Sequence, residues 1–138
     1  MTEEIKKISE YTIEIDGIRY TKETAKWLKI PELNIEVEIE VHDKNKSWNE
    51  LELGKREDEL LTVEECIFLA NSKYVKELKM GGSSSNNDFF IKQPFTLNKK
   101  NGYVAWFFAD SDRAGLICDG NPDYRYDSLG VRFKRKLK

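Results

Sequence analysis

The sequence predicts a single α+β domain in which strands come first, a helix lies near the middle and a loop-rich region follows in the C-terminal half. Three observations support this prediction. The segment NIEVEIEV, residues 34–41, alternates strictly between apolar and acidic residues, which is the pattern of a half-buried strand. Thr62 and Glu65 have the spacing of a capping box at the start of a helix. The apolar segments 89–95 and 103–108, separated by turn residues, are typical of strands. We therefore expect mixed or antiparallel sheets with one or two helices.

Length and composition exclude several classes of protein. At 138 residues the chain suits one domain, and its 39% hydrophobic and 35% charged residues indicate a modest core under a heavily charged surface. The net charge of −2 gives no general attraction to nucleic acid, and the basic end RFKRKLK is interpreted as a strand with a solvated tail. No apolar run approaches the roughly 20 residues of a membrane span, and the opening MTEEIKKISE lacks the apolar core of a secretory signal. We expect a cytoplasmic protein that binds neither nucleic acid nor membrane.

The first third of the chain is predicted to contain a hairpin, a short helix and the strand 34–41. In YTIEIDGIRY, residues 11–20, apolar residues alternate on both sides of the turn Asp16-Gly17, as in a hairpin. TKETAKWLKI, residues 21–30, predicts a short helix that stops before Pro31. In the strand 34–41, apolar side chains are expected to face inward and glutamates outward. The inward set is Ile35, Val37, Ile39 and Val41, and the outward set is Glu36, Glu38 and Glu40.

The middle of the chain is predicted to be a polar loop followed by a helix. Residues 42–58 indicate a loop with a short extended piece around Leu51 and Leu53. The helix begins after the capping box, breaks at Asn71-Ser72 and continues with a second turn through Leu78. Its apolar face is expected to hold Cys66, Leu69 and Ala70.

The C-terminal part is predicted to alternate between loops and strands. Gly, Ser and Asn residues indicate a flexible loop at 79–90, and TLNKKNG indicates a turn at 96–102. The final strands are expected at RAGLIC, residues 113–118, and at LGVRFKR, residues 129–135.

Catalytic chemistry is poorly represented in the chain. The one histidine, His42, ends the strand 34–41, and Asp43 is expected to point the other way, so His42 is interpreted as a surface or strand-end residue. Cys66 and Cys118 lie in different contexts and favour free thiols, although a disulfide stays open. The chain has no phosphate-binding or dinucleotide-binding glycine motif. We expect no enzyme and no cofactor.

Two pairs of aspartates leave an alternative open. Asp110 with Asp112, and Asp119 with Asp123, supply clustered carboxylates of the kind that bind Ca²⁺. Their spacing does not match an EF-hand loop, and no bidentate glutamate follows. Polar side chains on a solvated surface are the favoured interpretation of these aspartates. We expect no metal site and keep Ca²⁺ as the alternative.

The window FFADSDRAGLICDGNPDYRYDS, residues 107–128, differs in composition from the rest of the chain. It contains no Lys, Glu, Gln, Met or Trp, although these types make up 39 of the other 116 residues. Turns favour Asp, Asn, Gly and Ser, but this does not explain five aspartates without one glutamate, nor the Phe, Ile, Leu, Cys and Tyr residues between them. None of the five missing types has a codon that ends in C or T, so the window is typical of a segment written in such codons.

The segment GYVAWFFADSDRAGLICDGNPDYRYDSLGVRF, residues 102–133, resembles the variable proteins of diversity-generating retroelements with a C-type lectin fold, in particular those of archaea and their viruses. Its ending LGVRF is similar to the Gly-Phe-Arg ending of a wider group that includes formylglycine-generating, sulfatase-modifying domains, with Val131 in the middle position. The resemblance covers about residues 62–133. The catalytic cysteine arrangement of the formylglycine-generating enzymes is not present.

The resemblance implies a C-type lectin fold over residues 1–138 with a variable ligand-binding region at about 107–130. In an extended segment, alternate residues share a face, so Phe108 and Ile117 are expected to point outward beside aspartates. The interleaved Ala109, Ala114, Leu116 and Cys118 are expected to face the core. The predicted ligand-binding residues are Phe108, Asp110, Asp112, Gly115, Ile117, Asp119, Gly120, Asn121, Asp123, Tyr124, Tyr126 and Ser128.

The predicted function is therefore non-enzymatic binding of a protein ligand through surface complementarity, by a chain for which a monomer is favoured. A Ca²⁺-dependent carbohydrate-binding module, or a relative of the formylglycine-generating enzymes, is the alternative on the same fold. A small interaction module whose partner site lies elsewhere, for example on the charged segment 73–79, is a further alternative. The aromatic residues of the window also suit an ordinary core surrounded by turns.

Overall fold

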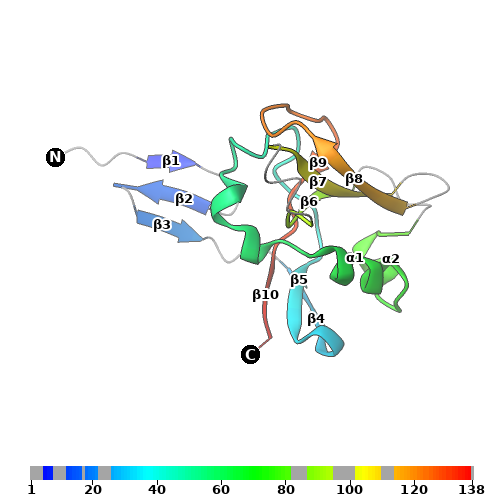
Figure 1. The fold of residues 1–138 in the computed structure, drawn as a ribbon. Coiled ribbons are helices and arrows are strands. Elements are labelled where there is room, and N and C mark those ends of the chain that lie inside the picture. Colours follow the sequence, from blue (N-terminus) through cyan, green and yellow to red (C-terminus); the bar gives the residue numbers. More distant parts are fainter. Residues whose placement is uncertain are drawn as a thin grey trace.

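The computed structural model describes residues 5–7, 12–16, 18–21, 26–81, 87–94, 102–109 and 114–137. These residues form three β-sheets and two short α-helices (Figure 1). The predicted α+β class is confirmed, with strands before and after a helical region near the middle of the chain. Within the described part, neither helix has the length and apolar character needed to cross a membrane.

The first sheet confirms the predicted hairpin. It consists of β1 (Ile5–Lys7), β2 (Thr12–Ile15) and β3 (Ile18–Thr21), which pair antiparallel in that order. Asp16 lies in the turn between β2 and β3 with a φ of 51°, a left-handed conformation that Asp adopts more readily than most residues.

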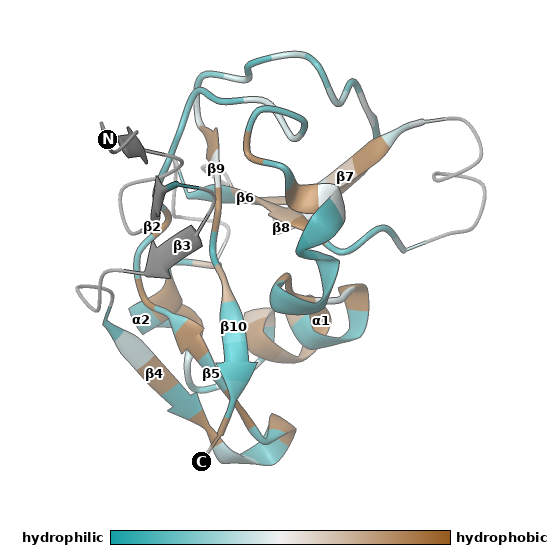
Figure 2. Cartoon of the chain, turned by 90° about the vertical axis from the view of Figure 1, so that its left-hand side faces the viewer, coloured by the Kyte–Doolittle hydropathy of each residue, from teal (hydrophilic) through white to brown (hydrophobic). Residues whose placement is uncertain are grey.

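The second sheet corrects the prediction for residues 21–30. Trp27–Ile30 form strand β4, which pairs antiparallel with β5 (Ile35–Glu38), and β5 pairs with β10 (Lys134–Lys136). The predicted helix is therefore wrong over Trp27–Ile30 and at Thr21, which is the last residue of β3, while residues 22–25 lie outside the described residues. The 3₁₀ turn Pro31–Leu33 joins the two strands, and the pairing buries Ile30 completely. Pairing with a neighbouring strand here outweighs local helix propensity. Figure 2 shows β10 in teal, because all three of its residues are basic.

Strand β5 follows the predicted alternation only in part. Ile35 and Val37 are buried as expected, and Ile39 and Val41 are half-buried. Glu38 is also buried, so the prediction that it faces outward is wrong. The strand ends at Glu38, and the chain bends at residues 39–40, which breaks the two-residue period that the prediction assumed.

The third sheet is mixed and forms the centre of the domain. Its strands are β6 (Asp88–Ile91), β7 (Val104–Ala109), β8 (Ala114–Gly120) and β9 (Leu129–Gly130), in the order β8-β7-β6-β9. Strands β6 and β9 run parallel, and the other neighbours are antiparallel. The predicted loop at 79–90 therefore ends before Asp88. Residues 82–86 and most of the predicted turn at 96–102 lie outside the described residues.

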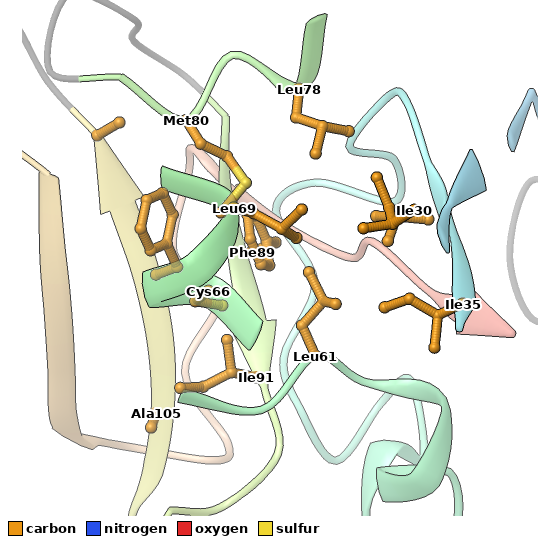
Figure 3. Packing of buried hydrophobic residues seen from close by; sticks show 13 residues of the cluster. Ile30, Ile35, Leu61, Cys66, Leu69, Leu78, Met80, Phe89, Ile91 and Ala105 are labelled. Atoms are coloured by element: carbon orange, nitrogen blue, oxygen red, sulfur yellow. The ribbon is translucent and has the colours of Figure 1, made fainter. Parts of the chain in front are cut away.

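One face of this sheet packs against the helices and the second sheet. Helix α1 (Val63–Ala70) begins at the predicted capping box: Glu65 N donates to Thr62 Oγ1 at 3.2 Å, and Thr62 N donates to Glu65 Oε1 at 2.8 Å. The chain breaks at Asn71-Ser72, and α2 (Val75–Leu78) follows as predicted. Figure 3 shows the side chains of this first core converging between the helices and the strands. It includes Cys66, Leu69, Leu78, Met80, Phe89, Ile91, Ala105 and Phe107.

The opposite face of the sheet packs against an irregular segment, residues 39–62. Leu51 and Leu53 are buried there, but in turns and the 3₁₀ helices Leu53–Lys55 and Glu57–Glu59, so the predicted extended piece is wrong. The second core consists of Trp48, Leu51, Leu53, Leu60, Phe90, Val104, Trp106, Leu129, Val131 and Phe133. Because both faces of β7 are covered, its residues are buried almost without exception.

Candidate functional site

The second core leaves a cleft of about 420 Å³ at the β7–β8 side of the sheet. We call it the aromatic cleft because three aromatic side chains line it. Its lining consists of Asp88, Trp106, Phe108, Ala109, Ile117, Tyr126, Asp127, Ser128 and Leu129. The cleft brings together strand β6, strands β7 and β8, and the chain before β9, which lie far apart in the sequence.

The alternation of β7 and β8 positions the apolar wall of the cleft. Phe108 and Ile117 pack at the edge of the second core and are half-buried, whereas Leu116 and Cys118 pack against the first core on the opposite face. The prediction that these pairs lie on opposite faces is confirmed. Ala114 is exposed, so the prediction that it faces the core is wrong. It is the first residue of β8, where burial by the neighbouring layer ends.

Two glycines lie beneath aromatic rings of the neighbouring strand. Gly115 pairs with Phe108, and a β-carbon at Gly115 would lie 3.0 Å from Cζ of that ring. Gly120 is buried, and the indole ring of Trp106 lies against it so closely that a β-carbon would overlap Cζ3. Both predicted binding residues therefore contribute backbone rather than side chains to this region.

The segment 121–128, between β8 and β9, is held together by hydrogen bonds around Asn121. Its backbone N–H donates to Oη of Tyr126 at 3.0 Å, and its side-chain oxygen accepts from Asp123 N at 2.9 Å. The Asn121 carbonyl accepts from Tyr124 N at 3.2 Å. This is the turn-forming chemistry for which Asn and Asp are suited. It fixes the Tyr126 ring at the cleft.

The same segment is attached to residues 49–50 of the irregular chain. Asn49 N donates to the Pro122 carbonyl at 3.0 Å, and Asn49 Nδ2 donates to Asp123 Oδ1 at 2.7 Å. Arg125 binds both carboxylate oxygens of Glu50, at 2.6 and 2.5 Å. This hydrogen bonding lowers the pKa of Glu50 to about 2 and raises the pKa of Arg125.

A row of aromatic rings leads from the cleft to solvent. The centroids of Trp106 and Tyr126 lie 4.6 Å apart, and those of Tyr126 and Tyr124 lie 4.7 Å apart. Trp106 is almost fully buried and Tyr126 half-buried, whereas Tyr124 is 58% exposed. Such tilted contacts are favourable beyond the area that they bury.

The structure gathers only some of the predicted binding residues at the cleft. Phe108, Ile117, Tyr126 and Ser128 line it, and Tyr124 and the exposed Asp119 lie nearby along the chain. Asp110 and Asp112 lie outside the described residues.

Sequence reasoning missed five cleft residues: Asp88, Trp106, Ala109, Asp127 and Leu129. Ala109 was expected to face the core, and Leu129 begins β9. Trp106 continues the alternation of Phe108 by two residues and could have been found from that spacing. Asp127 lies inside the unusual window. Asp88 reaches the cleft through the parallel pairing of Asp88 with Leu129, for which the sequence gives no local signal.

His42 is not the surface residue that was predicted. It is 5% exposed and forms an antiparallel bridge with Val131. Its Nε2 lies 2.8 Å from Glu38 Oε1, and its Nδ1 lies 2.7 Å from Asp43 Oδ2. Asp43 was expected to point away, but its φ of 53° brings its carboxylate back to the ring. Burial disfavours the charged ring, yet the hydrogen bonds to Asp43 and Glu38 outweigh it and raise the pKa of His42 to about 9.

Glu38 has a second partner, because its Oε1 accepts from the backbone N–H of Phe133 at 2.7 Å. The hydrogen-bonded residues Glu38, His42 and Asp43 therefore join the end of β5 to the chain before β10.

Metal and thiol chemistry has little support in the described residues. Within them, no group of three or more His, Cys, Asp or Glu side chains is placed to hold a metal ion. Cys66 and Cys118 are free thiols, as favoured. Burial raises the pKa of both thiols, which disfavours the reactive thiolate.

Comparison of the chain with family models, with curated proteins and with solved structures gave no match.

Proposed function

We propose that this protein is a non-enzymatic ligand-binding protein with a C-type lectin fold, whose residues 107–130 form a surface diversified by a retroelement. The aromatic cleft would be the centre of that surface, and the ligand would be a protein. The proposal covers the fold family, the diversification and the ligand class together.

A single observation carries the proposal. The window without Lys, Glu, Gln, Met and Trp supplies Phe108, Ile117 and Tyr126 to one cleft, and places the exposed Tyr124 beside it. Partly exposed aromatic side chains, tyrosines above all, are typical of a protein-binding surface. Tyrosines provide large contact areas at a small cost in side-chain entropy.

The contacts divide the window into supporting and available positions. Gly120 lies under Trp106, and Asn121 and Asp123 take part in the turn, so their substitution would alter the support of the surface. Four positions are at least partly exposed, and none of them has a positive φ that would restrict the choice of residue: Ile117, Asp119, Tyr124 and Asp127. Diversification that keeps the fold would therefore concentrate on the second set.

A display library tests the binding function. The four available positions are randomised with codons that end in C or T, and clones are selected on an unrelated folded protein. A control library randomises four exposed positions on the two helices and the turn between them, Glu64, Ile67, Lys73 and Lys76. We expect specific binders that keep cooperative thermal unfolding from the first library only. Equal yields from the two libraries, or loss of folding in most cleft clones, would contradict the proposal.

The coding DNA tests the diversification itself. We expect codons ending in C or T at the variable positions, and a near-identical template copy of the segment encoding residues 107–130 close by in the genome. Background codon usage without such a copy would remove the retroelement from the proposal, while the library would still measure binding.

A further inference from the structure

We propose that the outer edge of strand β8 binds an extended, uncharged segment of a protein partner, which pairs with residues 114–117 as an added antiparallel strand. The inference rests on the proposed binding function and specifies how the ligand is held.

Strand β8 is the outermost strand of the central sheet (Figure 1). Among the described strands it has a neighbour, β7, on one side only. Residues 114–117 pair one to one with residues 106–109 of β7, and the register shifts before Gly120. Such a bulge interrupts regular pairing, so the regular part of the edge is residues 114–117.

This edge is partly open to solvent. The residues of β7 are buried almost without exception, whereas Gly115, Leu116 and Ile117 are half-buried and Ala114 is exposed. An edge strand directs the N–H and C=O groups of alternate residues away from its neighbour. No other described segment pairs with these groups in residues 114–117. They therefore offer a row of donors and acceptors to an extended chain.

The other edges of the described sheets are protected against such pairing. Strands β1, β3, β4 and β10 each contain a basic residue, for example Lys29 in β4 and Arg135 in β10. Strand β9 is buried, and the chain at Leu129 and Val131 is bonded to residues 42–45. Charged side chains and covering segments are the usual means by which proteins prevent edge pairing. Residues 114–117 contain no charged side chain.

The composition of the edge selects the kind of segment that it accepts. Because residues 114–117 carry no charge, a charged side chain of an added strand would lose water there without gaining a partner, which is unfavourable. The segment is therefore expected to be uncharged. Antiparallel pairing continues the arrangement of β7 and β8 and is slightly more stable per residue than parallel pairing.

A second copy of this chain suits the edge less well than a separate partner. Four paired residues alone bury much less than the roughly 1,000 Å² of a stable interface, so further contacts are required. Two copies paired antiparallel through β8 would carry their aromatic clefts on the same face of the joined sheet, and neither copy would fill the cleft of the other. A separate partner can extend from the edge over the exposed Tyr124.

The two faces of the edge give the added strand different surroundings. Ile117 lies on the face of the aromatic cleft, and Leu116 lies on the opposite face against the first core. Neighbouring strands lie about 4.8 Å apart, so alternate side chains of the added strand would contact Ile117 and the others Leu116. In this mode of binding, main-chain hydrogen bonds give affinity and side-chain contacts give specificity. Substitution of Ile117 or Asp119 would therefore change the partner and keep the pairing edge.

Matched peptides test the inference on the full chain. The probe is the blocked, uncharged hexapeptide Thr-Val-Thr-Thr-Val-Thr, and its counterpart carries N-methyl groups on the two central residues. Because the N–H groups of neighbouring residues point to opposite edges of a strand, one methyl group blocks pairing whichever edge is used. NMR titration measures both affinities. We expect the unmethylated peptide to bind at least about fivefold more tightly, as the loss of a backbone hydrogen bond predicts.

Hydrogen exchange and a charged edge locate the effect. We expect the unmethylated peptide to slow exchange at alternate amides of residues 114–117 and to leave the amides of β10 unchanged. Ala114→Lys adds a charge to the edge, and Ile67→Lys adds one at a 56% exposed position of helix α1. We expect A114K to weaken the unmethylated peptide at least about threefold and I67K to leave it unchanged. Melting temperatures establish that both variants fold.

Equal binding of the two peptides, no shift with either, or equal losses in A114K and I67K would overturn the inference. So would a dimer in light scattering that A114K dissociates, because a second copy would then occupy the edge. A library that still yields binders in these cases would leave the proposed function standing. Selective binding of the unmethylated peptide together with an unsuccessful library would support the edge and contradict the proposed function.

Discussion

The indole ring of Trp106 lies against the backbone of Gly120, at the point where β8 leaves the central sheet. A β-carbon on Gly120 would overlap the ring and would also lie 3.0 Å from the Val104 carbonyl oxygen. The ring in turn supports Tyr126, so this contact underlies the inner wall of the aromatic cleft.

We expect Gly120→Ala to destabilise the protein by about 1–3 kcal/mol, because the added methyl group overpacks a buried site between a ring and backbone. Gly115→Ala is the matched control. Its methyl group would meet only the tip of the Phe108 ring, which borders the cleft and has room to shift, so we expect a smaller loss. Urea denaturation measures both. Equal losses in the free energy of unfolding would show that the Trp106–Gly120 contact is no tighter than the Phe108–Gly115 contact.

The buried His42 predicts a stability that depends on pH. Its pKa is about 9 in the folded protein against 6.5 ordinarily, so the protonated ring stabilises the fold. This stabilisation is complete below about pH 6.5 and is lost as the pH rises through about 9. The expected loss over that range is roughly 3 kcal/mol in the free energy of unfolding.

His42→Gln separates this effect from other groups that titrate above neutral pH. Glutamine can still donate a hydrogen bond to one carboxylate but carries no charge. We expect the variant to be less stable than the wild type at pH 6 and the difference to narrow at pH 9. A constant difference between the two pH values would mean that folding does not raise the pKa of His42.

We expect the Arg125–Glu50 ion pair to keep the segment 121–128 attached to the irregular segment. Arg125→Gln should raise the pKa of Glu50 from about 2 toward its ordinary value of 4.5, which carboxyl NMR titration measures. Amides of residues 121–128 should exchange faster, and high salt should reproduce part of this change in the wild type because the pair is exposed. Lys55→Gln, which removes another exposed ion pair, is expected to leave both readouts unchanged.

The capping box predicts the stability of helix α1. Thr62→Ala removes the acceptor for Glu65 N and should cost about 1 kcal/mol in thermal or urea unfolding. Thr62→Ser keeps the acceptor and should cost clearly less. Glu65 also binds Lys134 at 2.7 Å, so Glu65→Gln should keep the cap while losing the ion pair. If T62S is as unstable as T62A, the loss comes from the methyl group and not from the cap.

The Ca²⁺ alternative is tested by melting the protein with excess Ca²⁺ and with a chelator. An ion that binds the native state and not the unfolded state must raise the melting temperature. We expect no difference, because Asp123 already accepts a hydrogen bond from Asn49 and the described residues form no cluster of three candidate ligands. A clear rise with Ca²⁺ but not with Mg²⁺ would favour the metal-dependent interpretation.

Features with a local cause were predictable from the sequence. The hairpin at 12–21, the helix at Val63–Ala70 and its break at Asn71-Ser72 follow from turn, capping and periodicity signals that lie within a few residues of one another. The opposite faces of Ile117 and Leu116 follow from the period of an extended chain. Of the cleft lining, Phe108 and Ile117 were predicted for the same reason, and Tyr126 and Ser128 because they lie in the window of unusual composition.

Features that depend on distant partners were decided by the tertiary structure. Trp27–Ile30 became a strand because β5 provides hydrogen-bond partners that outweigh helix propensity. Glu38 and His42 can be buried because their polar atoms are hydrogen-bonded to each other. His42 also binds Asp43, and Glu38 also accepts from the N–H of Phe133, which lies 95 residues away in the sequence. Asp88 joined the cleft through pairing with β9. The sequence by itself determined which faces are apolar, since periodicity is local. Only the tertiary structure decided which polar groups are buried and which residues meet at the cleft, since both require partners far along the chain.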